Sequence, residues 1–460
     1  MRIRPPFFLP RGLPDDIIVD AYNFNVETAM EKSAREILTN GTWRKHQGLQ
    51  NAKELMKLLG DPQDEIPCVH VAGTNGKGSA AAYISSILTE AGYKTGLNTS
   101  PYLQVFNERF RINGRNISDA DIDRYFEPVY AAARKMDDRP NEFELITALA
   151  FEYFAGEKCD VSVIEVGMGG IDDATNVIGC PMCAVLMNIG LEHTKALGST
   201  LTEIAEKKAG IIKPGTEAVV YSQTPEVMEV FRRKCTETGA EYNPVDFSRL
   251  ELISSDLHGQ VFDFKRYKNI YTPLLGRHQL KNAAMAITTA ESLRKGGFEI
   301  PDSAIASGIE NVDWPARFEV ISKNPIFIID GGHNPQGAEA TRQCIEDYLG
   351  ERHIVLLTGI LADKDYRSVY DRIDPVVSEY VCTTVPGTPR AMEAGRLKDF
   401  LSGYGKPVTL AEDPESAILE AKSLADRGGA AVVFGSIYLA GAVRNVLRPL
   451  PREGAGTAQQ

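Results

Sequence analysis

The chain has 460 residues, which is long enough for about two or three domains and for a substantial hydrophobic core. Hydrophobic residues make up 43% of it and charged residues 24%, a composition that argues against collagen-like, disordered and membrane-embedded proteins. The formal net charge of −12 argues against a surface that follows a nucleic-acid backbone, although one local site for a small anion is compatible with it.

Cysteine spacing and hydrophobic stretches indicate the compartment. The 7 cysteines are an odd number at irregular spacing, which is not the pattern of a disulfide framework. Prolines in residues 1–14 interrupt the apolar core that a signal peptide needs, and no uncharged stretch reaches the roughly 20 residues of a membrane-spanning helix. We therefore expect a soluble, cytoplasmic monomer in a reducing compartment, with no nucleic-acid or membrane partner.

In the first half of the chain, short β-branched runs alternate with helical stretches. This alternation predicts an α/β fold with a mainly parallel sheet, in which ligands gather at the carboxyl ends of the strands. The periodicity places Phe143, Ile146 and Phe154 near one face of a helix. The expected strands are 66–73, 93–100, 159–170 and 183–190, and the expected helices are 79–92 and 141–156.

The second half repeats this alternation on a smaller scale, and a Trp-Pro break at Trp314 and Pro315 lies between the halves. We expect a domain boundary there, with a P-loop-type domain over 1–313 that binds ATP and a smaller Rossmann-like α/β domain over 314–460. The tail 451–460 is expected to be disordered. The strands expected in the second domain are 325–330, 353–360, 380–385 and 430–436.

The most informative stretch lies between the first expected strand and the helix that follows it. Its residues are Gly73, Thr74, Asn75, Gly76, Lys77, Gly78 and Ser79. Glycines let backbone N–H groups turn toward phosphate oxygens, the helix N-terminus adds a partial positive charge, and Lys77 adds a full one. The stretch therefore predicts a nucleotide-phosphate site.

The loop departs from the strict pattern of such sites in two places. Val71 stands where the first glycine is usual, and Gly78 stands where a Ser or Thr hydroxyl usually binds magnesium. The hydroxyl then comes either from Ser79 or from Ser100 at the end of the next strand.

These residues resemble the folylpolyglutamate synthase and dihydrofolate synthase family of Mur-type ligases. The resemblance extends in order from about residue 47 to residue 444, through both expected domains. The stretches that carry it include GTNGKGS (73–79), TSPYLQVFNERFRING (99–114), IGLEHTKALG (189–198), IDGGHNPQGA (329–338), GILADKD (359–365) and GSIYLAG (435–441).

The resemblance implies a magnesium site with one or two ions, and a monovalent cation such as K⁺ besides. Glu165 and Ser100 carry the oxygen donors that a hard cation prefers, whereas the imidazole of His193 is a softer ligand. A lone histidine is more often structural, but His193 matches a family position that binds magnesium. Lys208 reads as an exposed helix residue from its spacing alone, yet it matches a lysine that is carbamylated in the family.

The resemblance also implies contacts that close the nucleotide site. Asn282 matches a residue that contacts ATP, Arg317 one near the phosphates, and Asp330 and His333 nucleotide-contacting positions of the second domain. ATP would then draw the two domains together and exclude water. The stretch from Asp330 to Asn334 can equally be an ordinary turn into a helix that Asn334 caps, and the two interpretations are compatible.

The implied reaction joins L-glutamate to the carboxylate of a folate, or of dihydropteroate, at the expense of ATP. Transfer of the γ-phosphoryl group gives an acyl phosphate, which the amine of glutamate attacks, so that catalysis is mostly positioning and electrostatic stabilisation. Lys77 and Arg317 are the expected catalytic cations, Lys208 is an expected catalytic residue in its carbamylated, carboxylate-like form, and His333 is the candidate base. The residues implied to bind the acid substrate are Phe143, Glu144 and Asp173.

The chain departs from the family near the expected acid-substrate site. Ile171 and Asp172 replace Arg and Leu of the usual GGRLDATN, and Glu192 replaces an Asp. Two alternatives therefore stay open, a Mur-type ligase for a non-folate acid and a degenerate nucleotide-binding module without turnover. The CxxC at 180–183 has no second pair and is expected to be structural.

Overall fold

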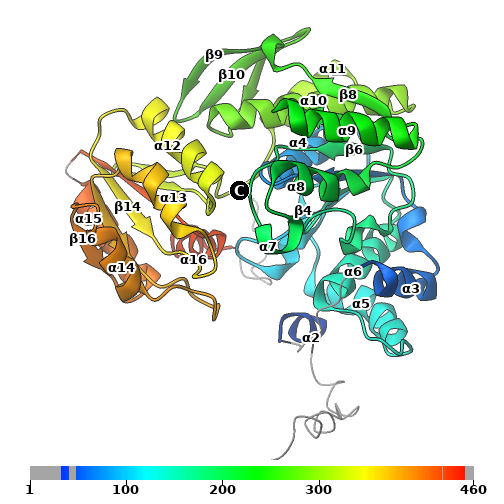
Figure 1. Ribbon diagram of the computed structural model, residues 1–460, viewed down its shortest axis with the longest axis horizontal. Coiled ribbons are helices and arrows are strands. Elements are labelled where there is room, and N and C mark those ends of the chain that lie inside the picture. The colour runs from blue at the N-terminus through cyan, green and yellow to red at the C-terminus, as the bar shows by residue number, and fades with distance from the viewer. Residues whose placement is uncertain (1–32, 41–47, 427, 451–460) are drawn as a thin grey trace, which may run out of the picture.

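The computed structural model describes residues 33–40, 48–426 and 428–450. Residues 1–14 and the tail 451–460, about which the sequence makes predictions, lie outside these ranges. Figure 1 shows two α/β units side by side, one drawn in blue to green and the other in yellow to red. Within the described ranges, no helix is long and apolar enough to cross a membrane.

The first unit is built on an 8-stranded sheet in the order β4-β3-β2-β5-β1-β6-β7-β8. Six of its strands pair in parallel and two edge strands pair antiparallel, which confirms the mainly parallel sheet. The parallel strands are β1 (Cys68–Ala72), β2 (Thr95–Asn98), β5 (Val161–Glu165), β6 (Cys183–Leu186), β7 (Glu217–Tyr221) and β8 (Glu241–Val245), and the edge strands are β3 (Phe110–Ile112) and β4 (Arg115–Asn116).

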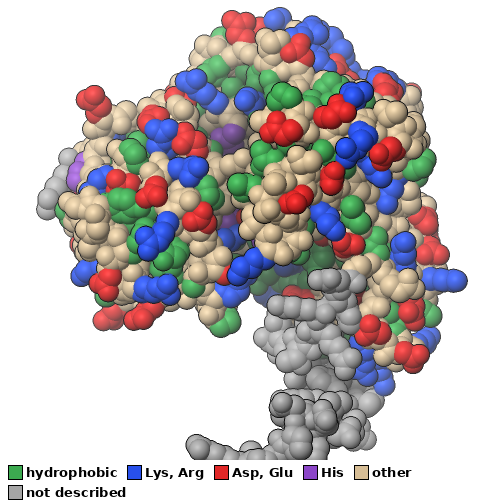
Figure 2. Space-filling model, in the orientation of Figure 1, with side chains coloured by type: hydrophobic (Ala, Val, Ile, Leu, Met, Phe, Trp, Pro, Cys, Tyr) green, Lys and Arg blue, Asp and Glu red, His purple; other side chains and the backbone are tan. Residues whose placement is uncertain are grey.

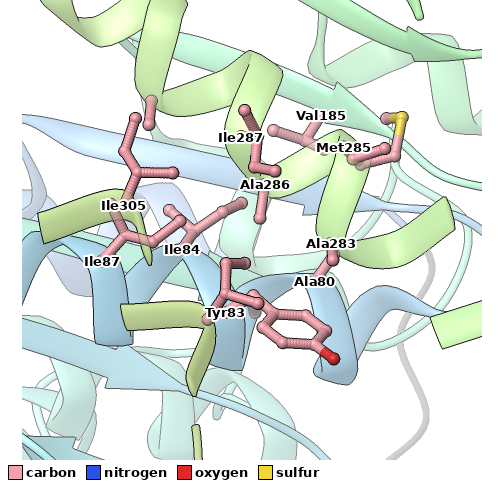
Figure 3. Close-up of a cluster of buried hydrophobic side chains, with 14 of the residues drawn as sticks. Ala80, Tyr83, Ile84, Ile87, Val185, Ala283, Met285, Ala286, Ile287 and Ile305 are labelled. Atoms are coloured by element: carbon pink, nitrogen blue, oxygen red, sulfur yellow. The ribbon is translucent and has the colours of Figure 1, made fainter. Parts of the chain in front are cut away.

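Helix α4 (Lys77–Glu90) follows the phosphate loop and is the centre of one hydrophobic core. It begins at Lys77 instead of residue 79, because Gly76 adopts a left-handed conformation (φ 82°) directly before it. The helix lies against α10 (Arg277–Lys295) and α11 (Asp302–Glu310), and a Cβ on Gly308 would come within 2.4 Å of the Ile87 Cα. Figure 3 shows this layer, where Ile84 and Ile87 of α4 face Ala286 and Ile305.

The other helices of this unit lie around the sheet or on one another. Helix α6 starts with a capping box, in which Asn141 accepts from the Glu144 N–H at 3.0 Å and the Glu144 carboxylate accepts from the Asn141 N–H. These helices are α2 (Ala34–Asn40), α3 (Gln50–Leu59), α5 (Asp119–Ala133), α6 (Glu142–Gly156), α7 (Thr194–Leu197), α8 (Leu201–Lys208) and α9 (Pro225–Thr238). Short 3-10 turns add η2 (Pro62–Asp64), η3 (Phe106–Arg109), η4 (Ala174–Val177), η5 (Ala209–Ile211) and η6 (Phe247–Arg249).

A separate three-stranded antiparallel sheet follows β8, and the sequence analysis did not anticipate it. Its strands are β9 (Leu250–Asp256), β10 (Gly259–Phe264) and β11 (Tyr267–Thr272), in the order β11-β10-β9. Strand β9 exposes nearly all of its side chains, including Leu252 and Ile253, so that it lacks the alternation by which a half-buried strand is recognised.

The second unit has a 6-stranded sheet in the order β12-β13-β17-β14-β15-β16, with a hydrophobic core on each face. All four predicted strands are present, and this smaller α/β unit confirms the expected architecture. The strands are β12 (Glu319–Lys323), antiparallel to the rest, β13 (Ile326–Ile329), β14 (Ile354–Thr358), β15 (Glu379–Cys382), β16 (Val408–Leu410) and β17 (Ala430–Phe434). The helices are α12 (Pro335–Leu349), α13 (Tyr366–Ile373), α14 (Ala394–Ser402), α15 (Pro414–Ala425) and α16 (Ile437–Leu447), with the turn η7 (Asp374–Val376).

Candidate active site

The phosphate loop joins the carboxyl end of β1 to α4 and lies against two neighbouring segments. A Cβ on Gly73 would come within 2.5 Å of the Met187 Cβ, and a Cβ on Gly76 within 2.7 Å of the Asn282 Oδ1. Glycine is therefore needed at both positions for the loop to adopt this path. The Thr74 N–H donates to the Asn188 carbonyl at 2.7 Å, which ties the loop to the segment after β6.

Lys77 and Glu165 face each other across the loop, because β5 lies beside β1 in parallel register. The Lys77 Nζ lies 4.0 Å from the Glu165 Oε1, and the Ser100 N–H donates to the Glu165 Oε2 at 3.0 Å. Burial raises the pKa of Glu165, while the Lys77 ammonium and the Ser100 N–H act in the opposite direction.

The side chains around Glu165 offer oxygen donors to a hard cation, but too few to complete its coordination without other ligands. Glu165, Ser100 and His193 line one cavity, and Ser79 lines it as well, so that either serine hydroxyl can reach a ligand there. Across the described ranges, no group of three or more His, Cys, Asp or Glu side chains is placed to hold a metal ion. The donor set fits a magnesium ion that also takes ligands from phosphate and water, as such ions usually do.

Lys208 is buried, contrary to the exposed position that its spacing suggested. Its side chain is 4% exposed, and its Nζ donates to the Gly73 carbonyl at 2.7 Å. Burial, with a further contribution from the Lys77 charge, lowers the pKa of Lys208 to about 7. The neighbouring Lys207 is the exposed one, and it pairs with Asp172 at 3.3 Å.

The second unit contributes a loop between β13 and α12. The Asp330 carboxylate accepts from the Phe318 N–H at 2.8 Å and from the Gly332 N–H at 2.7 Å. Both of its oxygens thus hold this loop in place, so that Asp330 organises the loop besides lining the cavity. The Arg317 guanidinium faces Asp330 and Glu165, whose charges oppose the lowering of its pKa by burial. Asn334 caps α12, as the turn interpretation predicted.

Glu192, one of the positions where the chain departs from its family, joins the two units. Its Oε1 lies 3.2 Å from the Lys364 Nζ and 3.5 Å from the His333 Nε2. Burial alone would raise the pKa of Glu192, but the hydrogen bond and charge of His333 and the charge of Lys364 hold it well below its usual range. The His333 Nδ1 donates to the Gly331 carbonyl at 3.0 Å, so that the Nε2 is the nitrogen that faces Glu192.

Asn75 also reaches the second unit, where it contacts the N-terminus of α12. Its amide donates to the Gln336 Oε1 at 2.8 Å and accepts from the Asn334 amide at 2.9 Å. Farther from the loop, Arg277 and Asp347 form a bidentate ion pair with distances of 2.9 and 3.0 Å. Through Asn75, the phosphate loop of the first unit is therefore in direct contact with the second unit.

Two adjoining cavities contain most of the predicted residues. The nucleotide cavity, of about 520 Å³, is lined by Thr74, Asn75, Gly76, Lys77, Gly78, Ser79, Ser100, Glu165, His193, Asn282, Arg317, Asp330 and His333. The acid cavity, of about 640 Å³, is lined by Phe143, Glu144 and Asp173 and shares Ser100, His193 and His333 with the first. The space-filling view shows a hollow between the units, with Lys, Arg and His side chains around it (Figure 2). Gly73, at the start of the loop, and Lys208, which donates to its carbonyl, line neither cavity.

Several cations of the acid cavity carry no signal in the sequence that predicts a functional role. Arg109 lies on it between Tyr102 and Phe106, with its guanidinium carbon 5.3 and 5.7 Å from the two ring centroids. Its Nε and Nη1 are buried and have no hydrogen-bond partner in the described part of the chain. Lys364 and Arg390 also line this cavity. Arg109 and Lys364 occur in stretches that carry the resemblance, but no local pattern distinguishes them from surface cations.

Two family models match the chain. The model of the Mur ligase middle domain matches residues 71–290, and that of the Mur ligase glutamate ligase domain matches residues 316–437. Together with the fold and the two adjoining cavities, these matches define the protein as a Mur-type ligase.

Full-length relatives narrow the class. Folylpolyglutamate synthase of Lacticaseibacillus casei is 38% identical over 85% of this chain and 92% of its own, and dihydrofolate synthase/folylpolyglutamate synthase of Bacillus subtilis is 35% identical over 87% and 95%. The structure of Mycobacterium tuberculosis folylpolyglutamate synthase complexed with ADP is 34% identical, with a TM-score of 0.85 over 93% of this chain and all of that one. The chain belongs to the folylpolyglutamate synthase/dihydrofolate synthase family.

The lowered pKa of Lys208 predicts a pH-dependent effect of removing its charge. Since the native Lys208 has a pKa of about 7 and an unfolded lysine one of about 10.4, the native state binds fewer protons between these values. We expect Lys208→Met to be more stable than the natural protein in CO₂-free buffer at pH 6.5, and this advantage to shrink steadily toward pH 10. Thermal unfolding midpoints measure it, with the exposed Lys207→Met as control. An advantage of Lys208→Met that does not change with pH would contradict the shifted pKa.

Proposed function

We propose that the chain is an ATP-dependent ligase that adds L-glutamate to the carboxylate of a folate, and that dihydropteroate is a second acceptor. The observation that carries this proposal is the junction of the two cavities. Ser100, His193 and His333 line both, so that a phosphate bound by the loop and an acid bound in the neighbouring cavity would meet there. Residues 1–313 would bind ATP and the acid, and residues 314–460 would present glutamate.

Residues around the loop would promote phosphoryl transfer to the acid. A carboxylate is a poor electrophile, and its conversion to an acyl phosphate gives it a good leaving group. Lys77 and Arg317 lie where negative charge develops on the transferred group. Ser100 and Glu165, with His193, would hold one or two Mg²⁺ ions, which neutralise phosphate charge when bound. A bound K⁺ is a further part of this proposal.

The second step is attack of the glutamate amine on the acyl carbon, which releases phosphate. In its neutral form His333 carries its proton on Nδ1, so that its Nε2 is the candidate acceptor for the amine proton. Glu192, 3.5 Å from this nitrogen, would stabilise the imidazolium that results. The same pair keeps Lys364 in place on the side of the second unit. We further propose that the enzyme acts as a cytoplasmic monomer.

The substrate panel is the direct test of this function. Purified protein with ATP, Mg²⁺ and glutamate should release ADP when tetrahydrofolate is added, and also with dihydropteroate if the enzyme has both activities. Lys77→Ala removes the cation beside Glu165 and should lower turnover by about 10²-fold or more, as the loss of a transition-state cation typically does.

The outcomes separate the alternatives. If neither pterin acid leads to ADP release, a ligase for another acid is the second candidate, which the departure at Asp172 on the acid cavity and that at the adjacent Ile171 favour. Full activity of Lys77→Ala would contradict the role of the phosphate loop. Absence of all turnover, with nucleotide still bound, would point to a degenerate module.

We also propose that Lys208 is carbamylated. Its reduced pKa leaves a large share of the side chain as a neutral amine at pH 7, and a neutral amine adds CO₂ with loss of one proton. The product keeps one N–H, which can still donate to the Gly73 carbonyl. Protein equilibrated with ¹³C-bicarbonate should show one carbamate carbon resonance that Lys208→Met lacks and Lys207→Met retains. The same resonance in Lys208→Met would contradict the assignment.

Arg109 is expected to bind a carboxylate of the acid substrate or of glutamate, because two of its buried nitrogens have no partner among the described residues. Arg109→Lys keeps the charge but loses the planar fork that pairs with a carboxylate. We expect this variant to raise the KM of one carboxylate substrate about tenfold, for the loss of about 1.4 kcal/mol, with an unchanged KM for ATP. Initial rates at saturating ATP measure it, and unchanged KM values for both substrates would contradict the role.

A further inference from the structure

A buried histidine lies in the centre of the first sheet, and the reaction described above does not use it. His70 is in β1, is fully buried, and lies between the neighbouring strands β5 and β6. Its Nε2 lies 2.8 Å from the Thr175 Oγ1 in the turn η4. The Thr175 hydroxyl in turn donates to the Asp173 Oδ1 at 2.6 Å.

The direction of these hydrogen bonds follows from the single proton of the threonine hydroxyl. Since that proton is donated to Asp173, the hydroxyl can only accept from His70, which must carry its own proton on Nε2. The Nδ1 is then a bare acceptor, and it has no hydrogen-bond partner in the described part of the chain. Burial, with a smaller contribution from the Lys213 charge, lowers the pKa of His70 to about 3, so that the ring is neutral.

In this series of hydrogen bonds, every donor points toward Asp173. Besides the hydroxyl, the Thr175 N–H donates to the Asp173 Oδ1 at 3.1 Å, and the Met168 N–H donates to the Oδ2 at 2.7 Å. Asp173 is 6% exposed and lines the acid cavity beside Phe143. Burial raises the pKa of Asp173, and the hydrogen bonds from Met168 and Thr175 act in the opposite direction, toward the ionised carboxylate. Hydrogen bonds aligned in one direction also strengthen one another.

An unpartnered imidazole nitrogen in a central strand lowers the stability of the fold, since a buried polar atom without a partner loses its hydration. A leucine at position 70 would lack this cost. The series of hydrogen bonds from His70 ends at Asp173, which lines the acid cavity. We therefore expect His70 to affect what binds in that cavity.

We propose that His70 is a positioning residue for the acid substrate: through Thr175 it keeps Asp173 ionised and oriented to accept hydrogen bonds from N–H groups of that substrate. The role rests on the proposed function only in that an acid with N–H donors occupies this cavity. Phosphate binding at the loop does not depend on it, because neither Thr175 nor His70 lines the nucleotide cavity.

Steady-state kinetics with the acid varied at saturating ATP and glutamate test the proposal. His70→Leu and Thr175→Val each interrupt the series of hydrogen bonds from His70 to Asp173. Each should raise the KM for the acid about tenfold and leave the KM for ATP unchanged. His70→Gln, whose amide can donate to Thr175, and Thr175→Ser should restore most of the affinity. The double variant should have the same KM for the acid as either single variant, because each substitution already interrupts the same series of hydrogen bonds.

Thr289→Val is the matched control, since this buried hydroxyl bonds only to the Met285 carbonyl of its own helix among the contacts described. It should leave both KM values unchanged. Equal increases in the KM for ATP and for the acid, or additive effects in the double variant, would mean a general structural role and would overturn the proposal.

A spectroscopic measurement tests the same chain without turnover. In ¹⁵N-histidine-labelled protein, the resonances that His70→Gln lacks should be those of a neutral ring protonated on Nε2 throughout pH 5–9. A ring protonated on Nδ1, or one that titrates in this range, would overturn the proposal. If no folate is turned over at all, the proposed function fails while this result still decides the state of His70.

Discussion

The hydrogen bond from the buried Lys208 Nζ to the Gly73 carbonyl fixes the phosphate loop from the side of α8. It is strong because burial removes competing water, and it is costly for the same reason, as the lowered pKa of Lys208 reflects. With the loop held there, Lys77 faces Glu165 at the end of β5, and Gly76 lies against Asn282 of α10. The loop geometry, the position of the candidate phosphate-binding cation Lys77 and that of the candidate metal ligands thus depend on one desolvated contact.

Closure of the site is built from contacts made by the same loop. Asn75, which sequence reasoning assigned to the nucleotide, hydrogen-bonds to Asn334 and Gln336 at the start of α12. Glu192 supplies an electrostatic link from the first unit to Lys364 and His333 of the second. Residues proposed to hold phosphate in the first unit are therefore in contact with the second unit, so that nucleotide binding would be energetically coupled to closure of the site.

Sequence reasoning located the elements whose signal is local. Buried β-branched runs predicted β1, β2, β5 and β6 of the first sheet and four strands of the second, whereas β7, β8 and β16 were not predicted. The glycine-lysine loop predicts a phosphate site from the same kind of local pattern, one of neighbouring residues. The sheet of β9 to β11 was missed because β9 is exposed on both faces. The link of Glu192 to Lys364 spans 172 positions, and the burial of Lys208 but not Lys207 depends on how α8 is turned against the loop. The ion pair and the burial of Lys208 result from tertiary packing, and no pattern of neighbouring residues predicts them.

Every role proposed above depends on the cavity between the loop and the second unit being the nucleotide site. A crystal structure of the full chain with magnesium and a non-hydrolysable ATP analogue tests it most directly. We predict the triphosphate along the backbone N–H groups of residues 74–78, with the γ-phosphate between Lys77 and Arg317 and the metal at Glu165 and Ser100. A triphosphate bound outside this cavity, or one that leaves Lys77 without a phosphate contact, would contradict the account.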